Sequence, residues 1–378
     1  MLKRSNSTFL LVSIRFFFSN LFPANTERVR SRISVQGQVR NLVAAMSPQT
    51  TIASVVAILA IASSGTGAAA TAPAPAPADD IVVVPWPVTT EMSLNVSMGY
   101  GTVPSTGTRF SWYSATLNDL SRFTVQLPLN GGCSTRAGTT QTAAEHDCEI
   151  AVNAGYFQFV PKPTYCLGQI VVDSAIQEWA PDGNPMFGIL GNRSSFVGTL
   201  TSQDDISRLN VTYAVSGFGV LVRDGEIHHE GVRAAAAAVR RHKHFAKSVA
   251  TTVDAASPQS LSSSVKAEEI APRTVIGLDN YGQLVLVAID GVEALDLGLT
   301  LAESAEIFSS STPGFPFGGN VAHAINMDGG GSTTFTKTLP EGTTPHLYNR
   351  PTSTDIGDVV ERNVTTIACI ARQSFGQA

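Results

Sequence analysis

Residues 324–335 read AINMDGGGSTTF: an apolar run ends in an acid and is followed by three glycines and three hydroxyl side chains. Glycine lets the backbone adopt positive φ and lets a ligand approach the main chain, at an entropic cost. Three glycines inside an apolar region indicate a loop that does more than pack. The loop offers polar groups that could hold a phosphate or a sugar, namely Asp328, Gly329, Gly330, Ser332, Thr333 and Thr334. The alternative is a tight turn with an aspartate cap.

A predicted hairpin precedes this loop. Its strands are Arg273–Leu278 and Leu284–Ile289, joined by a turn at Asp279–Gly282. The first residue of one antiparallel strand and the last residue of its partner lie at the same end, so Arg273, beside Thr274, and Asp290 should share a rim. Arginine offers a bidentate fork for phosphate, and the aspartate could act as an acid or a base. A plain ion pair that closes the hairpin is the alternative.

A second polar loop follows a buried strand at residues 149–152. It reads NAGYF and contains Asn153, Gly155 and Tyr156. An asparagine at a strand end, followed by glycine and two aromatic residues, suits a loop that lines a pocket and stacks on a sugar. The alternative is an ordinary turn whose aromatic side chains return to the core.

Most of the chain beyond Ile81 is predicted to form short strands. Further strands are expected at residues 109–114, 122–127, 209–214, 219–223 and 363–371, and short helices at 139–148 and 300–308. Thr139 or Thr140 would cap the first helix, and a capping box of Thr300 and Glu303 would start the second. We therefore expect an α+β fold with a mixed, largely antiparallel sheet core and a few packed helices, forming a single catalytic domain over residues 81–374.

One segment, residues 228–271, departs from the strand pattern. An Ala-rich, basic, helical stretch is followed by a Ser-rich run, and we interpret the segment as a surface insertion. Four histidines fall within it and could bind a metal, although exposed decoration is the preferred interpretation: His228, His229, His242 and His244.

The N-terminal residues read as targeting segments. Residues 1–45 carry seven Lys or Arg residues and one acid, Glu27, as in a transit peptide or an upstream extension. Residues 46–70 resemble a secretory signal, because an apolar segment too short to span a bilayer leads to an Ala-rich cleavage region. Residues 71–80 form an Ala/Pro linker. We expect the secretory lumen or secretion, or an organelle if residues 1–45 are a genuine transit segment.

Composition limits the partners. The 378 residues are 43% hydrophobic with a net charge of −5, which argues against nucleic acid, and no later segment is apolar enough for a membrane span. Four cysteines follow the signal and are consistent with two disulfides. No Cys-x-x-Cys pair occurs, so neither a metal nor a cofactor is expected. Four glycosylation sequons support a secretory route, at Asn95, Asn192, Asn210 and Asn363.

These segments, in this order, resemble the phosphodiester glycosidase family. The resemblance rests on CEIAVNAGYF (148–157), CLGQIVV (166–172), GVLVRDG (219–225), RTVIG (273–277), GQLVLVAIDG (282–291) and AINMDGGGSTTF (324–335). It implies hydrolysis of the sugar C1–O bond in a sugar-1-phosphodiester of the GlcNAc-1-phospho-6-mannose type, carried by a glycan or glycoprotein. A metal-dependent phosphodiesterase and a non-catalytic glycan-binding module are the alternatives.

The implied chemistry assigns roles to the predicted residues. An oxocarbenium-like transition state needs a carboxylate, for which Asp328 is the first choice and Asp290 the second. Arg273, Ser332, Thr333 and the glycine amides would hold the phosphate, and Asn153 and Tyr156 the sugar.

The cysteines allow three pairings. The local environments favour a strand-to-strand Cys148–Cys369 bridge and a loop-to-loop Cys133–Cys166 bridge. The family resemblance implies the same arrangement.

Overall fold

The computed structural model describes residues 81–85, 93–158, 164–180, 183–253, 269–352 and 359–373, without the side chains of residues 242–253. All of these residues belong to one compact unit of the chain. The expected upstream extension, signal peptide and linker (residues 1–80) lie outside the described residues, as does the Ser-rich end of the expected insertion.

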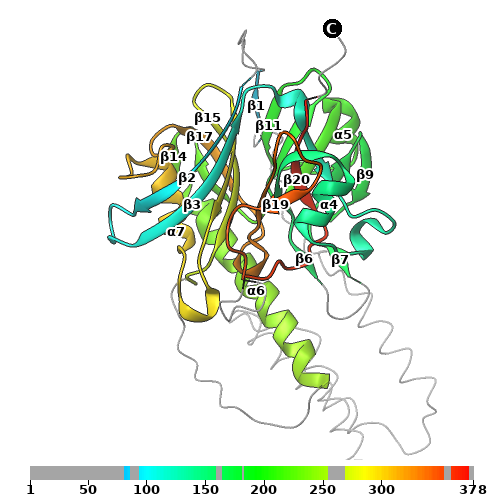
Figure 1. The fold of residues 1–378 in the computed structure, drawn as a ribbon. Helices are drawn as coiled ribbons and strands as arrows, with labels where there is room; N and C mark the ends of the chain where they lie inside the picture. The colour runs from blue at the N-terminus through cyan, green and yellow to red at the C-terminus, as the bar shows by residue number, and fades with distance from the viewer. Residues whose placement is uncertain are drawn as a thin grey trace, which may run out of the picture. The chain divides into compact units, whose positions relative to one another are not determined.

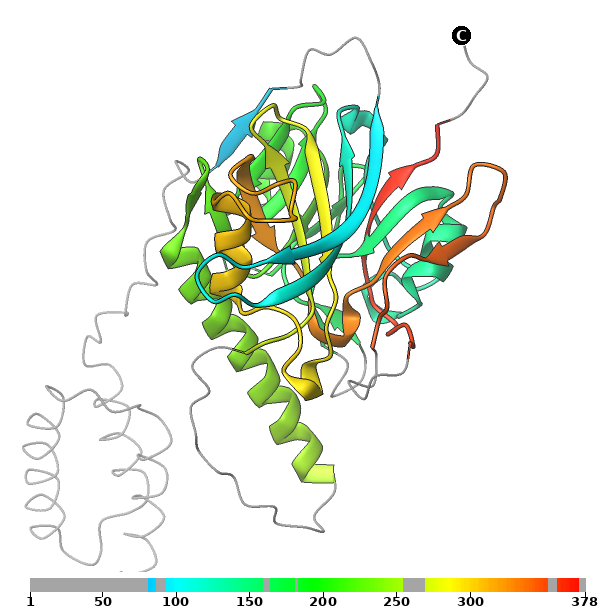
Figure 2. The same ribbon diagram turned by 60° about the vertical axis from the view of Figure 1, so that its left-hand side comes forward.

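Three antiparallel sheets form the body of this unit (Figures 1 and 2). The six-stranded sheet has the order β1 (Val82–Val84), β11 (Ser195–Gly198), β10 (Met186–Leu190), β12 (Val211–Ser216), β8 (Ile170–Val172) and β9 (Ala175–Glu178). The seven-stranded sheet has the order β14 (Glu226–Ile227), β13 (Val220–Arg223), β17 (Val321–Asn326), β15 (Arg273–Asp279), β16 (Leu284–Ile289), β3 (Arg109–Leu117) and β2 (Leu94–Thr102). The five-stranded sheet has the order β19 (Pro345–Leu347), β18 (Phe335–Thr338), β5 (Cys148–Asn153), β20 (Ile367–Ala371) and β4 (Phe123–Gln126). A small ribbon pairs β6 (Phe157–Gln158) with β7 (Tyr165–Cys166).

Helices are short except for one. The described α-helices are α4 (Thr139–Glu145), α5 (Asp204–Leu209), α6 (His229–Val253) and α7 (Leu301–Ser309). Single 3₁₀ turns occur at η2 (Leu120–Arg122), η3 (Gly132–Ser134), η4 (Glu293–Leu295) and η5 (Gly330–Ser332). The described helices contain no segment long and apolar enough to cross a membrane.

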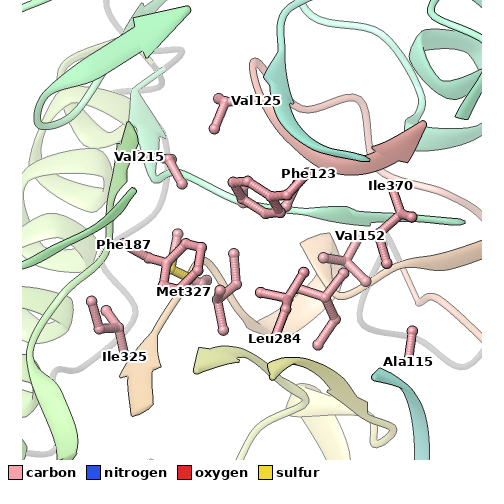
Figure 3. Close-up of a cluster of buried hydrophobic side chains, with 14 of the residues drawn as sticks. Ala115, Phe123, Val125, Val152, Phe187, Val215, Leu284, Ile325, Met327 and Ile370 are labelled. Atoms are coloured by element: carbon pink, nitrogen blue, oxygen red, sulfur yellow. The ribbon is translucent and has the colours of Figure 1, made fainter. Parts of the chain in front are cut away.

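The main core lies where the three sheets meet. Phe187 and Val215 come from the six-stranded sheet, Leu284 from the seven-stranded sheet, and Phe123 and Val152 from the five-stranded sheet, and all five are buried in one cluster (Figure 3). Successive side chains of a strand point to opposite faces of its sheet. The central strands β15 and β16 are buried on both faces, which explains why they read as continuous apolar runs rather than alternating ones.

The outer sheet faces are covered by helices. Alternate residues of β15 and β16, such as Val275 and Val287, pack in a second cluster with Val232 of α6 and Phe308 of α7. A third cluster joins the six-stranded sheet to α5, and a fourth joins the five-stranded sheet to α4. The sheets therefore hold one another on their inner faces and carry the helices outside.

The strand predictions largely agree with this arrangement. All pairings between the named strands are antiparallel, and the one parallel contact among the described residues is the isolated Thr352–Val360 bridge. The expected mixed character is therefore not found in the described ladders. The capping box that starts α7 is confirmed. The expected threonine cap of α4 is wrong, because Gly138 occupies the N-cap and makes no side-chain bond.

The segment beginning at His228 is not wholly a surface insertion. Val232 and Ala235 are buried in the cluster beneath the seven-stranded sheet, and Val239 is buried against Phe218 and Tyr156. The alanine run was misleading because small side chains let a helix approach a sheet closely, and here Gly219 meets the helix at Ala235. The first part of α6 is thus part of the core, and its later turns extend away from the sheets (Figures 1 and 2).

Both predicted disulfides are confirmed. Cys133–Cys166 joins two segments 33 residues apart, and Cys148–Cys369 joins β5 to β20 across 221 residues. The four sequon asparagines, Asn95, Asn192, Asn210 and Asn363, are exposed. Glycosylation at these positions stays a prediction.

Candidate functional site

The loop after β17 is held by the main chains of two other strands. Met327 donates its amide to the Thr274 carbonyl, and Asp328 donates to the Ala154 carbonyl, both at 2.9 Å. The Gly330 amide donates to the Pro272 carbonyl, also at 2.9 Å. The start of β15 and the end of β5 therefore meet at Asp328. This juxtaposition brings together the three loops that the sequence singled out.

Asn153 holds the loop from below. Its Nδ2 donates to the Asp328 carbonyl at 2.7 Å, and its Oδ1 accepts from the Thr274 hydroxyl at 2.7 Å and from the Thr334 amide at 3.0 Å. Asn153 and Thr274 are both fully buried. These bonds give Asn153 a positioning role, since its amide group is already occupied within the protein. Its expected contact with a sugar is not supported by this geometry.

Tyr156 is a core residue in this structure. Its ring stacks on Phe218 at 3.8 Å between centroids, and its hydroxyl accepts a hydrogen bond from Asn326 Nδ2 at 2.7 Å. Only 4% of the residue is exposed. The alternative interpretation of the NAGYF stretch, in which the aromatic side chains return to the core, is the one that the structure favours.

The surroundings of Tyr156 show which charges meet here. Burial, and then the Asp328 carboxylate, raise the pKa of the Tyr156 phenol well above its ordinary value, while Arg273 acts in the opposite direction. Asp328 and Arg273 therefore both influence this phenol. Their main chains also lie close together, because a β-carbon built on Gly329, the residue after Asp328, would lie 3.7 Å from Arg273 Cα.

Arg273 is anchored from within the protein. It is 3% exposed, and its Nε donates to the Leu299 carbonyl at 2.9 Å, while Nη2 donates to the Glu269 carbonyl. These bonds fix the guanidinium and leave its predicted contact with phosphate as a prediction.

The relation of Arg273 to Asp290 is confirmed in part. Arg273 pairs with Ile289 in the ladder, so both residues lie at the same end of the hairpin. Because neighbouring side chains alternate between faces, Asp290 points to the opposite face of the sheet from Arg273.

Asp290 belongs to a separate polar group. It accepts hydrogen bonds from Asn349 Nδ2 at 2.8 Å and from the Arg350 amide at 3.2 Å. Burial raises the pKa of Asp290, and these hydrogen bonds act against that rise. Burial and then the Asp290 charge raise the pKa of Tyr113 to about 12. Asn349 also donates to the Thr333 carbonyl at 3.1 Å, which ties this group to the glycine loop.

The predicted hydroxyl and amide donors are mostly engaged or buried. Ser332 and Thr333 are each 1% exposed. The amides of Gly330, Ser332 and Thr333 all donate within the protein. Gly155 donates its amide to Thr366 Oγ1 at 2.8 Å. The expected open nest of amides therefore does not form from these groups as they stand.

Two polar atoms in the same region lack partners. Within the described part of the chain, Ser332 Oγ and Asn326 Oδ1 are buried without a hydrogen-bond partner. Buried polar atoms without partners are rare in proteins and mark positions that need an explanation. Asn326 and Thr366 were not singled out by the sequence; the place of Asn326, two residues before Asp328, was the available signal.

The described residues contain no group of three or more His, Cys, Asp or Glu side chains that could hold a metal ion. His228 has a local role instead, because its Nδ1 accepts from the Gly231 amide at 3.1 Å at the start of α6. The side chains of His242 and His244 lie outside the described set.

Comparison with known proteins places this architecture. The family model for phosphodiester glycosidases matches residues 146–371, which is more than half of the chain and includes the ends of β5, β15, β16 and β17 that form the site. The chain belongs to the phosphodiester glycosidase family, a family of hydrolases.

Particular relatives are consistent with this assignment. The chain is 32% identical over 209 residues to the Homo sapiens N-acetylglucosamine-1-phosphodiester alpha-N-acetylglucosaminidase, and the match covers 54% of this chain and 35% of that protein. The Mus musculus protein of the same name is 30% identical over 210 residues, with 54% and 35% covered. The chain thus spans about a third of the length of the curated relatives it matches.

A solved structure supports the fold. The zebrafish N-acetylglucosamine-1-phosphodiester alpha-N-acetylglucosaminidase catalytic domain, auto-inhibited by its pro-peptide, superposes with a TM-score of 0.57 at 24% identity. The match covers 78% of this chain and 88% of that one. The two chains therefore share their overall fold.

Proposed function

We propose that residues 81–374 act as a single α+β catalytic domain that hydrolyses the C1–O bond of a sugar-1-phosphodiester. The substrate would be of the GlcNAc-1-phospho-6-mannose type, and the products a free sugar and a phosphomonoester. Family membership supports the reaction class, and the names of the curated relatives support N-acetylglucosamine as the sugar.

One observation carries this proposal most directly. Asp328 is only partly buried. It is held at the junction of three loops by Ala154 and Asn153, and the residue after it, Gly329, packs against Arg273. Breaking the C1–O bond creates positive charge at C1 and negative charge on the departing phosphate. The Asp328 carboxylate would stabilise the positive charge at C1, and the Arg273 guanidinium the negative charge on the phosphate. Preorganised groups aimed at developing charge stabilise the transition state in this way.

The predicted residues then divide into those that act on the substrate and those that hold the loop. Asp328 faces the sugar C1, and Arg273 and the Ser332 hydroxyl, which has no hydrogen-bond partner among the described residues, would bind the phosphate. Asn153, Thr274 and the glycine positions hold the loop in place. Asp290 was the second choice for the catalytic carboxylate; its bonds to Asn349 and Arg350 favour a role in fixing the loop that follows β16.

The setting of the reaction is part of the proposal. Two disulfides suit an oxidising compartment, and the exposed sequon asparagines suit a glycoprotein. We therefore place the enzyme in the lumen of the secretory pathway or outside the cell, with a glycan or glycoprotein as its substrate.

Replacement of Asp328 by asparagine tests the proposal. The purified protein would be incubated with a GlcNAc-phospho-mannoside, and free GlcNAc and mannose 6-phosphate would be quantified. Asp328→Asn should lower kcat by at least about 100-fold, since electrostatic groups of this kind contribute that much. Asp296→Asn, an exposed acid in the loop after β16, is the matched control and should keep wild-type activity. Near-wild-type turnover by a folded Asp328→Asn variant would make Asp328 a loop cap and refute the assignment.

A further inference from the structure

A second carboxylate reaches the glycine loop from a different part of the chain. Glu293 lies in the loop that follows β16, at the first residue of η4. Val292 and Leu297 exchange main-chain hydrogen bonds of 3.0 and 3.1 Å across this loop, so the backbone that carries Glu293 is closed into a compact turn. The side chain is partly exposed.

The glycine loop records where the Glu293 carboxylate lies. A β-carbon built on Gly330 would meet Glu293 Oε2 at 2.4 Å. The carboxylate therefore occupies the space that any side chain at residue 330 would need. Gly330 also has a φ of 60°, which favours glycine independently. The Glu293 carboxylate therefore packs directly against the main chain of Gly330, the second of the three consecutive glycines.

This position is close to Asp328. Consecutive Cα atoms are 3.80 Å apart, so the Cα atoms of residues 328 and 330 are separated by at most about 7.6 Å. A bridge from a third segment supports the juxtaposition, since Asn349 bonds both Asp290, three residues before Glu293, and the Thr333 carbonyl. Two carboxylates, from the ends of β16 and β17, thus flank the same loop.

Their environments differ in a way that separates their tasks. Asp328 is followed by Gly329, where a built β-carbon would lie 3.8 Å from Cδ of the buried Arg273. Glu293 is carried by a turn whose next residues, Ala294 to Leu297, are exposed. A carboxylate that must exchange protons with solvent is better placed at Glu293 than at Asp328. Pairs of acids in unlike environments commonly divide into one that stays charged and one that transfers a proton.

We propose that Glu293 is a catalytic carboxylate of this site and acts as the general base toward the attacking water. The inference rests on the proposed function. The water oxygen forms a bond to C1 as the C1–O bond breaks, and the electron pair of that bond leaves on the phosphate oxygen. One water proton passes to Glu293, which later releases it to solvent. Asp328 stabilises the positive charge at C1 throughout.

The test compares three variants in the GlcNAc-phospho-mannoside assay. Glu293→Gln should lower kcat by about 10²- to 10⁴-fold, the usual contribution of a general base, with little change in KM. It should also shift the acid limb that we expect in the wild-type pH profile of kcat/KM, because Glu293 must be ionised to accept the water proton. Asp296→Asn removes an acid three residues away and should retain both the rate and the acid limb.

Chemical rescue separates a catalytic role from a structural one. Azide needs no deprotonation, so added azide should restore turnover of Glu293→Ala and yield a glycosyl azide, in which a C1–N bond has replaced the C1–O bond. The general-base assignment would be overturned if azide gave no rescue, or if the kcat of Glu293→Gln were within about threefold of that of Asp296→Asn. The proposed function would still stand in that case, provided that the wild type is active. A wild type that releases no sugar would refute the proposed function and the inference with it.

Discussion

Asn153→Ala tests whether the loop that bears Asp328 is held from below. The substitution removes three hydrogen bonds, to the Asp328 carbonyl, the Thr274 hydroxyl and the Thr334 amide. The Thr274 hydroxyl can turn toward Thr333 Oγ1, 3.5 Å away, but the two main-chain groups lose their partner. A buried polar group left unsatisfied costs about 1–3 kcal/mol, so we expect the loss of two partners to lower the free energy of unfolding by about 2–6 kcal/mol.

Catalysis should suffer along with stability. Asn153 touches the loop and not the solvent, so its loss should lower kcat more than it raises KM. Urea unfolding and steady-state kinetics on the same preparation measure both effects. Asn320→Ala is the control, because this exposed asparagine should change stability by less than about 0.5 kcal/mol. A stability loss below 1 kcal/mol together with unchanged kcat would refute the positioning role.

The other predictions concern the fold. Replacing the Cys148–Cys369 bridge by two alanines should lower the free energy of unfolding by about 5 kcal/mol in the chain-entropy model, because the bridge closes a loop between residues 221 positions apart. A loss below about 1 kcal/mol in urea unfolding would contradict this prediction. Ala235→Leu should lower the free energy of unfolding by about 1–3 kcal/mol, because the larger side chain would overpack against Gly219. Ala234→Leu, at an exposed position, should leave the free energy of unfolding unchanged. Equal effects of the two substitutions would mean that α6 does not pack as described. Burial lowers the pKa of His323 below its ordinary 6.5, so the unfolded chain binds more protons than the folded one, and the stability present above pH 6.5 should be lost as pH falls through the folded pKa. His323→Gln should flatten this pH dependence of the free energy of unfolding, measured by urea titrations at several pH values. An unchanged pH dependence would exclude His323 as its source.

Local patterns predicted much of the fold. The hairpin of β15 and β16 was marked by two apolar runs around a turn, and the capping box of α7 by Thr300 and Glu303, because such signals depend on residues near one another in the chain. The first turns of α6 were misread as a surface insertion. Their burial depends on close approach to Gly219, a tertiary contact that an alanine run does not announce.

The site was predictable in position more than in detail. The glycines and Asp328 stood out, yet the inward direction of Asn153 follows from a bond to a residue 175 positions away. Glu293 escaped notice for the same reason, since its loop has no motif of its own. Only the neighbouring order of β16, β15 and β17 in one sheet brings its carboxylate over Gly330.

The central claim is that the bond broken is the sugar C1–O bond, and isotope labelling tests it most directly. The same two products, free GlcNAc and mannose 6-phosphate, arise whether the C1–O bond or the adjacent P–O bond breaks. Hydrolysis of the GlcNAc-phospho-mannoside in ¹⁸O-labelled water distinguishes them by mass spectrometry of the mannose 6-phosphate. Our account predicts a phosphate without ¹⁸O, because water attacks C1. An ¹⁸O atom in the phosphate would mean attack at phosphorus and would contradict the account.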